Sequence, residues 1–567
     1  ATFPSAGTWT NFASGGTITQ PNGTGDYYLH IKAIDTVGNT RQSTSNKFVL
    51  DNTAPTVTLT HNPPDLIVRD ADNVTITATF NEPMANTPKI TIANGGVSAF
   101  NMTMGANNRI WTYSWNVPAT NVTATVTVAG TDLAGNAYAG TNNIVFTVDN
   151  IAPTLSISVP SATTAKNGTN VAYTINYTGA DAVTLAASNI TLNKTGTANG
   201  TVAVTGTGTA TRTVTISNIT GDGTIGISIA AGTASDIAGN TSAAVGPSTT
   251  FVADNTVPTV NAPTVTAIDN QSIKITPNAL DPVTGGVAVG LHGTPYTYNR
   301  DSLDVATNQA GEYTDSGLEV NKAYTYKYKA KDKLNNESSY SSEITKYTLA
   351  KTPAVSLDSS DQSSVNGSID LNGNPSYTQT YVERADDAGF TANVTVIKEW
   401  NNSIIFKANG LTSGKTYYFR VKARNGDNIE TAWSAIEQIV TIPATPGAPG
   451  VIPNTDTTKM DISWDVVPGA NLYKLYRDGA EIYSGAATSY TDSSLSANHQ
   501  YAYTLKACNA SGESDLSAQT IKYTLANIPE LSIQSATQRN IFGEISLEGN
   551  PSYTETLVEI ATDAAFT

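Results

Sequence analysis

Strict alternation of apolar and polar residues recurs along this chain, and it narrows the available folds more than any other feature. Clear examples lie at 74–80, 122–128 and 171–177, where Val, Ile, Ala, Phe or Tyr alternates mainly with Thr and Asn. Successive side chains of a β-strand point to opposite faces, so a period of two indicates strands with one buried and one solvated face. Helical periodicity is hard to find. The chain is therefore predicted to be all-β.

Two linked signatures repeat in the first half of the chain. Asp-x-x-Gly-Asn occurs at 35–39, 132–136 and 236–240, and Asp-Asn-x-x-Pro-Thr occurs at 51–56, 149–154 and 254–259. Gly and Asn tolerate the positive φ of hairpin turns, and proline, which lacks a backbone donor, suits the start of an edge strand. Each Asp-Asn linker is therefore predicted to end one domain and open the next.

A different repeat follows residue 254. A Leu stands six residues before a Tyr that opens a run ending in Lys-Ala, at Leu318 and Tyr324, Leu411 and Tyr417, and Leu495 and Tyr501. A longer period overlies it, because Lys-Tyr-Thr-Leu-Ala at 346 recurs at 522 and Gly-Asn-Pro-Ser-Tyr-Thr at 373 recurs at 549. The common offset of 176 residues predicts a two-domain cassette whose second copy has begun. The sequence is expected to be a fragment of a longer array.

The first pair of signatures resembles the bacterial Ig-like domains of large surface adhesins, over roughly the first 254 residues. The second repeat resembles strand F of fibronectin type III domains, and Trp464 with the run 472–479 resembles their strands B and C. This match is strongest over 444–526. The resemblance implies tandem β-sandwiches and assigns a structural tyrosine-corner hydrogen bond to Tyr324, Tyr417 and Tyr501.

Repeats and resemblance together predict seven domains or parts of domains. These are the C-terminal part of an Ig-like domain at 1–52, Ig-like domains at 53–150 and 151–254, fibronectin III-like domains at 255–349, 350–442 and 443–526, and the N-terminal part of another at 527–567, which repeats 350–391.

Composition excludes several classes of function. The formal net charge of −16 disfavours binding to the phosphate backbone of nucleic acids. No run of 18 apolar residues predicts a membrane span, and no signal peptide opens the sequence. The single cysteine, Cys508, excludes an intrachain disulfide and is expected to be a small buried apolar residue.

Catalytic chemistry has little support in the sequence. The four histidines lie in different modules, so a Ser/His/Asp triad within one domain has no visible support, and no pair of histidines shows zinc spacing. No Walker loop occurs either. The chain is therefore predicted not to be an enzyme. Tryptophans on the surface could stack on sugars, and the candidates are Trp111, Trp115, Trp400 and Trp433. For Trp111 and Trp115 a place in the core is preferred.

Carboxylates near the linkers predict calcium sites. In an Ig-type sandwich the B–C and F–G loops lie at the pole where the chain enters, beside the preceding linker. Clustered carboxylate and amide oxygens suit calcium, which takes six to eight oxygen ligands, and the Ig-like resemblance also implies linker calcium. The expected ligands are Asp51, Asn52, Glu82 and Asp132 at one junction, Asp149, Asn150, Asp181 and Asp236 at the next, and Asp254, Asn255 and Asp332 at the third. Alternatively, Asp and Asn here only cap their own turns.

The preferred interpretation is a non-catalytic extracellular rod on a cell surface, such as an S-layer, sheath, filament or adhesin stalk. Its expected partners are neighbouring copies of itself, other surface proteins, or glycans. The alternative is a spacer or carbohydrate-binding region of a large secreted glycoside hydrolase or other exoenzyme. Fold alone does not separate the two, because such modules serve all these purposes.

Overall fold

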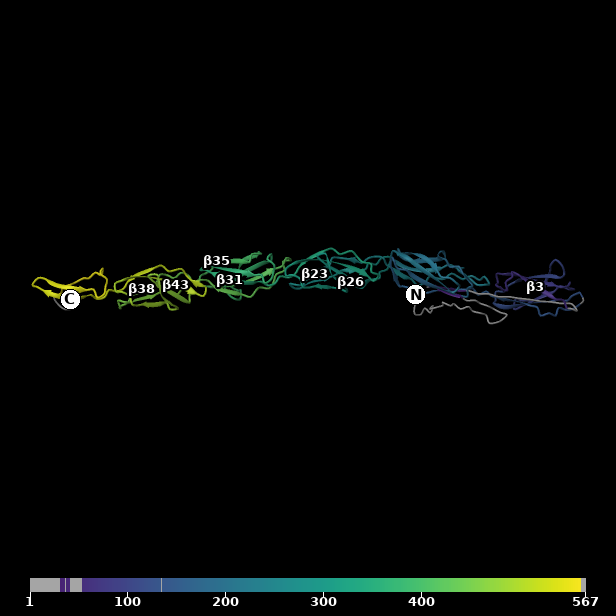
Figure 1. The fold of residues 1–567 in the computed structure, drawn as a ribbon, viewed down its shortest axis with the longest axis horizontal. Helices are drawn as coiled ribbons and strands as arrows, with labels where there is room; N and C mark the ends of the chain where they lie inside the picture. The colour runs from purple at the N-terminus through teal and green to yellow at the C-terminus, as the bar shows by residue number, and fades with distance from the viewer. Residues whose placement is uncertain (1–30, 36, 41–53, 134, 562–567) are drawn as a thin grey trace.

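Five β-sandwiches follow one another along a nearly straight line, and a β-hairpin comes after the fifth (Figure 1). This computed structural model describes residues 31–35, 37–40, 54–133 and 135–561. The sandwiches are named first to fifth, in the order 57–148, 154–253, 259–347, 354–440 and 450–523, and the C-terminal hairpin is 530–546. The described elements are strands apart from one 3-10 turn, so the all-β prediction is confirmed. None of the described segments forms a helix long and apolar enough to cross a membrane.

The first sandwich packs a four-stranded sheet on a five-stranded sheet. The four-stranded sheet has the order β3 (Val57–Asn62), β5 (Asn73–Phe80), β9 (Ile110–Asn116) and β8 (Thr103–Met104). The five-stranded sheet has the order β4 (Ile67–Val68), β11 (Ile144–Val148), β10 (Val122–Ala129), β6 (Lys89–Ala93) and β7 (Val97–Asn101). The alternating residues of β5 and β10 point inward as predicted, and Trp111 and Trp115 also lie in this core.

The second sandwich shares one of its sheets with the N-terminal strands. That sheet has the order β1 (Ile31–Asp35), β2 (Val37–Thr40), β12 (Thr154–Ile157), β14 (Val171–Thr178), β18 (Thr211–Thr220) and β17 (Asn199–Thr205). The other has the order β13 (Thr164–Ala165), β21 (Phe251–Ala253), β19 (Gly223–Ile229) and β16 (Ile190–Lys194). A small pair, β15 (Ala182–Val183) and β20 (Ala234–Ser235), and the 3-10 turn η2 (Ala187–Asn189) complete it.

The third sandwich has a three-stranded and a four-stranded sheet. The former has the order β23 (Thr264–Ala267), β24 (Ile273–Thr276) and β28 (Tyr313–Asp315). The latter has the order β27 (Leu303–Gln309), β26 (Leu291–Arg300), β29 (Ala323–Asp332) and β30 (Ile344–Tyr347). A short pair, β22 (Thr259–Val260) and β25 (Ala279–Leu280), lies at its entry.

The fourth and fifth sandwiches repeat this plan of three strands on four or more. The fourth pairs β31 (Ala354–Ser360), β32 (Ser364–Asp370) and β35 (Ile405–Asn409) with β34 (Thr395–Asn401), β33 (Gln379–Ala385), β36 (Thr416–Arg424) and β37 (Glu437–Val440). The fifth pairs β38 (Gly450–Pro453), β39 (Met460–Ser463) and β42 (Ser489–Asp492) with β41 (Ala480–Gly485), β40 (Leu472–Arg477), β43 (Gln500–Asn509), β44 (Gly512–Glu513) and β45 (Thr520–Tyr523). The hairpin is β46 (Glu530–Ala536) and β47 (Ile541–Ser546).

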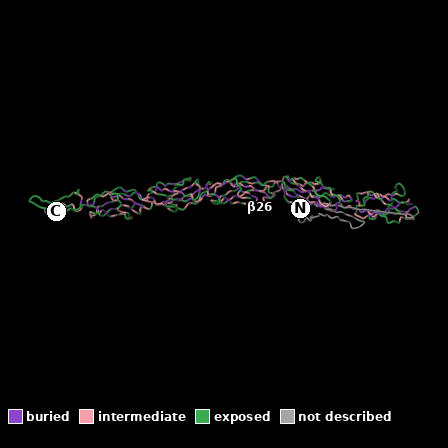
Figure 2. The backbone as a smooth tube through the Cα atoms, in the orientation of Figure 1, coloured by how far each residue is buried: buried purple, intermediate pink, exposed green. Residues whose placement is uncertain are grey.

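Each sandwich has a hydrophobic core of its own, and the five cores are separate clusters. Figure 2 shows buried residues running through the inside of the sandwiches, whereas the C-terminal hairpin is exposed. Cys508 is buried and unpaired, as predicted, and burial raises the pKa of its thiol. Within the described ranges no core continues across a linker, so other contacts must set how the sandwiches meet.

The predicted tyrosine corners are present in the last three sandwiches. The hydroxyl oxygens accept a hydrogen bond from the backbone N–H five residues earlier in each case, Glu319 to Tyr324 at 2.9 Å, Thr412 to Tyr417 at 2.8 Å and Ser496 to Tyr501 at 2.9 Å. This bond fixes the loop that leads into β29, β36 or β43. With the three-on-four sheet plan, it supports the fibronectin III-like interpretation of these sandwiches.

Candidate functional site at the junctions

An asparagine clamps each of the four junctions between sandwiches. Its side-chain amide donates a hydrogen bond to a backbone carbonyl of the preceding linker, and we call this bond the linker clamp. The four clamps are Asn240 to Asp149 at 2.8 Å, Asn336 to Asp254 at 3.0 Å, Asn425 to Thr348 at 3.1 Å and Asn509 to Thr441 at 2.8 Å. A carbonyl at a junction is thereby satisfied by the next sandwich, which ties the two together.

The clamp has two chemical forms. In the second and third sandwiches an aspartate accepts from the clamp asparagine four residues later, at 2.8 Å for Asp236 and Asn240 and 2.7 Å for Asp332 and Asn336. In the fourth sandwich the equivalent position is Asn425, whose carbonyl oxygen caps its own turn while its amide donates across the junction. A carboxylate cannot donate, so the aspartate form needs a second residue and the asparagine form does not.

At two junctions, glycines also bring the backbones of neighbouring sandwiches into close contact. A Cβ built on Gly414 of the fourth sandwich would lie 2.0 Å from the carbonyl oxygen of Pro468 in the fifth. One built on Gly285 of the third sandwich would lie 2.0 Å from the carbonyl oxygen of Asp222 in the second. Both glycines have positive φ, which L-residues adopt at a cost. Backbones can approach this closely only where there is no side chain.

The junction of the second and third sandwiches gathers three carboxylates. Ligand atoms of Asp254, Asp281 and Asp332 all lie within 4.8 Å of one another, and this is the one such metal-competent group among the described residues. Asp254 and Asp332 are fully buried. Asp281 accepts a 2.6 Å hydrogen bond from the backbone N–H of Gly290 through Oδ2, whereas its buried Oδ1 has no hydrogen-bond partner among the described residues.

Burial and mutual repulsion oppose ionisation of this cluster. Burial raises the pKa of Asp254, and backbone donors such as that of Val289 offset the rise only in part. Burial also raises the pKa of Asp281, and the charges of Asp254 and Asp332 add to the effect. A cation would relieve both the desolvation and the repulsion.

Asn255, which the sequence places in the same calcium site, turns toward the second sandwich instead. Its amide donates to the carbonyl of Gly221, and its carbonyl oxygen accepts from the backbone of Asn167, both at 2.7 Å. Its backbone N–H donates to Asp222 at 2.7 Å. Burial alone would raise the pKa of Asp222, but hydrogen bonds from Asn255 and Thr256 hold it below the ordinary value. Asn255 therefore fastens the linker to the sandwich that it leaves.

At the junction of the first and second sandwiches the predicted residues act mainly through hydrogen bonds. Asp236 accepts from Asn240, and Asp149 accepts from the backbone of Ile151 at 2.9 Å. Asp181 is exposed, and its backbone N–H donates to the carbonyl of Ser235, the residue before Asp236. The structure gathers no trio like that of the next junction here, within the ranges that it describes.

Two further predicted ligands, Asp51 and Asn52, precede the first sandwich and lie outside the described residues. Asp132 is fully buried and accepts from the backbone and the side chain of Asn136, both at 2.8 Å. Glu82 is partly buried, and its loop contacts this turn through an isolated β-bridge between Met84 and Asp132. Asp132 thus caps its own turn, the alternative role considered for it.

The sequence prediction missed Asp281. It follows β25 in the B–C loop, the same loop whose acidic residues, Glu82 and Asp181, are expected to reach the other junctions. The same reasoning, applied to the third sandwich, would have selected it.

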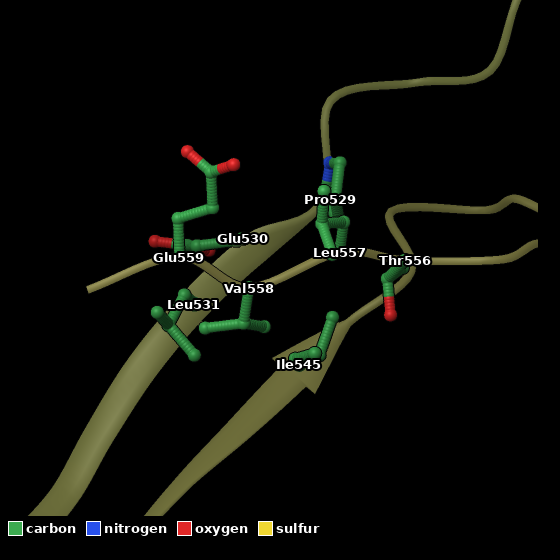
Figure 3. Close-up of a pocket in the computed structure, with 8 residues that line it drawn as sticks. All are labelled: Pro529, Glu530, Leu531, Ile545, Thr556, Leu557, Val558 and Glu559. Carbon is green, nitrogen blue, oxygen red and sulfur yellow. The ribbon is translucent and has the colours of Figure 1, made fainter. Parts of the chain in front are cut away.

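The apolar hollow at the C-terminal hairpin has a structural origin. It has a volume of about 490 Å³ and is lined by Leu531, Ile545 and Val558, among others (Figure 3). The residues 176 positions earlier, Val355, Ile369 and Val382, are buried in the core of the fourth sandwich. The hollow therefore lies on the face that corresponds in sequence to the buried face of the fourth sandwich.

Comparisons with known proteins give partial matches, and no family model matches the chain. The chain is similar to Exoglucanase B of Cellulomonas fimi, with 26% identity over 257 residues, 41% of this chain and 23% of that protein. It is similar to the poly(3-hydroxybutyrate) depolymerase of Ralstonia pickettii, 43% over 65 residues, and to an alpha-amylase of Niallia circulans, 36% over 107 residues. These cover 11% and 16% of this chain, and 13% and 8% of those proteins.

The chain thus spans less than a quarter of the length of each of these relatives. A structural match, the crystal structure of chicken CNTN1 FN1–FN3 domains, covers 47% of this chain and 98% of its own. Its identity is 14% and its TM-score 0.23.

Proposed function

We propose that this chain is a non-catalytic, extracellular spacer of a secreted polymer-degrading enzyme, built as a stiff row of β-sandwiches. The observation that carries the proposal is the linker clamp, which recurs at all four junctions between sandwiches. Flexible linkers behave as random coils, whereas here each linker is hydrogen-bonded on both sides. Such a row holds whatever lies at its two ends at a fixed separation.

The comparisons support an enzyme context. Three proteins named for polymer breakdown share partial matches with the chain, and each match is a minor part of the relative. Their named substrates differ, so a module common to them fits an accessory role better than a catalytic one. This favours the exoenzyme spacer over the cell-surface rod that the sequence first suggests.

Small-angle X-ray scattering on the chain tests the stiff row. We expect the distance distribution of a thin rod, and a compact or broadly averaged distribution would contradict it. Incubation with cellulose, starch and poly(3-hydroxybutyrate) should release no soluble product. Release of product from any of the three would show that the chain is itself an enzyme.

A divalent cation, calcium by the oxygen-only ligand set, is proposed to stiffen the junction of the second and third sandwiches. The support is the buried trio of Asp254, Asp281 and Asp332 and the unpartnered Oδ1 of Asp281. Carboxylate oxygens in such a cluster match the hard-cation preference of calcium. The other junctions use hydrogen bonds alone in this proposal.

A cell-surface stalk is the second candidate function. The 176-residue cassette that starts a second copy favours it, because repeated cassettes make long arrays. The open reading frame that surrounds the chain separates the two: a hydrolase domain supports the spacer, and a wall-anchoring segment supports the stalk.

A further inference from the structure

A small polar cleft lies where the third sandwich meets the fourth. Its volume is about 140 Å³, and it is lined by Tyr347 of the third sandwich and Tyr377, Gln379, Arg424 and Asn428 of the fourth, among others. This is the volume of about five water molecules and well below that of a pocket for a drug-sized ligand. The cleft therefore has room for one ring-sized group of a ligand.

Tyr377 gives the cleft a fixed aromatic surface. Its side chain is 52% exposed, yet its hydroxyl donates a 2.7 Å hydrogen bond across the junction to the carbonyl of Asn321. An aromatic ring held at its polar end keeps its orientation while its apolar face meets water. Tyr347 is placed just as firmly, because a Cβ on Gly426 would lie 2.3 Å from its Cζ.

Arg424 supplies hydrogen-bond donors at the same place. Its Nε donates to Oε1 of Gln379 at 2.7 Å, and its guanidinium lies 4.7 Å from the ring centroid of Trp400. The ion pairs among the described residues include the neighbouring Arg384 and Arg420 but not Arg424. Its planar fork of N–H groups is therefore held in position with donors to spare for a ligand.

An aromatic surface continues from the cleft over the outer face of the fourth sandwich. Trp400 lies 5.1 Å from Tyr381, and Tyr381 lies 6.1 Å from Trp433, as centroid distances. Lys422 lies 4.7 Å from the ring centroid of Trp433. The opposite charges on this face pair internally, through Arg420 with Glu383 and Lys422 with Glu430. The guanidinium of Arg424 remains available to donate hydrogen bonds to the hydroxyl groups of a ligand.

We infer that this cleft is a saccharide-binding site that takes one pyranose ring of a neutral glucan. The ring of Tyr377 would stack on the apolar face of the sugar, while Arg424 and Asn428 bind hydroxyl groups. This inference rests on the proposed spacer function and deepens it, because the spacer then also holds the polymer. The Tyr377 contact recurs one cassette later, where Tyr553, 57% exposed, donates to the carbonyl of Asn498 at 3.0 Å.

Binding of the full chain to glucans tests the inference. We would measure retention on insoluble cellulose and starch, and affinity for cello- and malto-oligosaccharides by titration calorimetry. The intact chain should be retained on at least one glucan. Loss of the stacking ring in Tyr377→Ala should weaken binding about tenfold, which corresponds to about 1.4 kcal/mol and lies within the range of aromatic contacts.

A matched variant separates binding from support of the junction. Tyr377→Phe removes the hydrogen bond to Asn321 but keeps the ring, so it should retain most of the affinity. Phe100→Ala removes an exposed ring on the first sandwich and should change nothing. Equal loss in Tyr377→Ala and Tyr377→Phe would overturn the stacking role. No retention of the intact chain on any glucan would overturn the site while leaving the rod seen by scattering intact.

Discussion

The side-chain amide of Asn425 donates to the backbone carbonyl of Thr348 across the junction of the third and fourth sandwiches, at 3.1 Å. The carbonyl oxygen of the same amide accepts from the backbone of Ile429 at 2.9 Å, so one residue both closes its turn and holds the neighbouring linker. Position 425 corresponds to Asp332, where the clamp comes from Asn336 four residues later. The two forms can therefore be interchanged by substitution.

Asn425→Asp should break this clamp. The carboxylate still accepts from the turn but cannot donate, and it repels the carbonyl of Thr348, so the unfolding free energy should fall by about 1–2 kcal/mol. Adding Ile429→Asn rebuilds the aspartate form of the clamp and should restore most of the loss. Chemical denaturation and scattering measure the two effects, with Asn428→Asp as the charge control on the same turn. A double variant no better than the single one would contradict the clamp.

Gly414→Ala should open the junction of the fourth and fifth sandwiches. The new Cβ would lie 2.0 Å from the carbonyl oxygen of Pro468, so the two sandwiches must move apart. Gly410→Ala is a matched control, because Gly410 has a similar positive φ but nothing within 4 Å of its Cβ position. Both variants should lose roughly 1 kcal/mol to backbone strain. The distribution of energy-transfer efficiencies between dyes on the two sandwiches should broaden for Gly414→Ala and not for Gly410→Ala.

Calcium should stabilise the chain at neutral pH and lose its effect in acid. Raised carboxyl pKa values favour folding at low pH, near and below the ordinary value of 3.8, and this stabilisation is lost as pH rises through the folded-state pKa of Asp254 and Asp281. A cation should restore stability at pH 7. Melting with calcium and with a chelator measures this, for Asp281→Asn against the exposed control Asp465→Asn. Equal melting temperatures for the intact chain in both conditions would rule out the cation.

Lys398 should make the fourth sandwich more stable at alkaline pH. Burial lowers its pKa from 10.5 to about 8, even though its Nζ donates to the carbonyl and the hydroxyl of Thr380 and to the carbonyl of Asn401. A depressed lysine pKa favours the folded state at high pH, and this stabilisation declines as pH falls from 10.5 to 8. Denaturation across this window should show stability rising with pH. The slope should vanish in Lys398→Met and persist in the exposed control Lys407→Met.

Local patterns in the sequence were enough to predict the strands. Period-two runs such as 171–177 depend only on neighbouring residues, so they reveal the buried face without knowledge of the partner strand. The role of Tyr324 and its counterparts was predicted from the resemblance to fibronectin type III domains, and their hydrogen bond spans five residues of one loop. The place of Cys508 in the core follows from the same local pattern.

The junctions could be predicted only in part. The polar loops were expected at the right pole, and Asp254 and Asp332 do meet there. The direction of Asn255 depends on Gly221 and Asn167, which are distant in sequence, so no local pattern shows it. The contact of Gly414 with Pro468 joins two separately folded bodies, and a glycine in a turn looks the same with or without such a neighbour.

The separation of the five cores has a mechanical consequence. Because none of the five cores in the described part of the chain crosses a linker, a pull on the two ends should unfold one sandwich while its neighbours keep their structure. Each event would release on the order of 300 Å of extended polypeptide from some 90 residues. Under load the row would then lengthen in steps, one sandwich at a time, and it would shorten again by refolding when the force is removed.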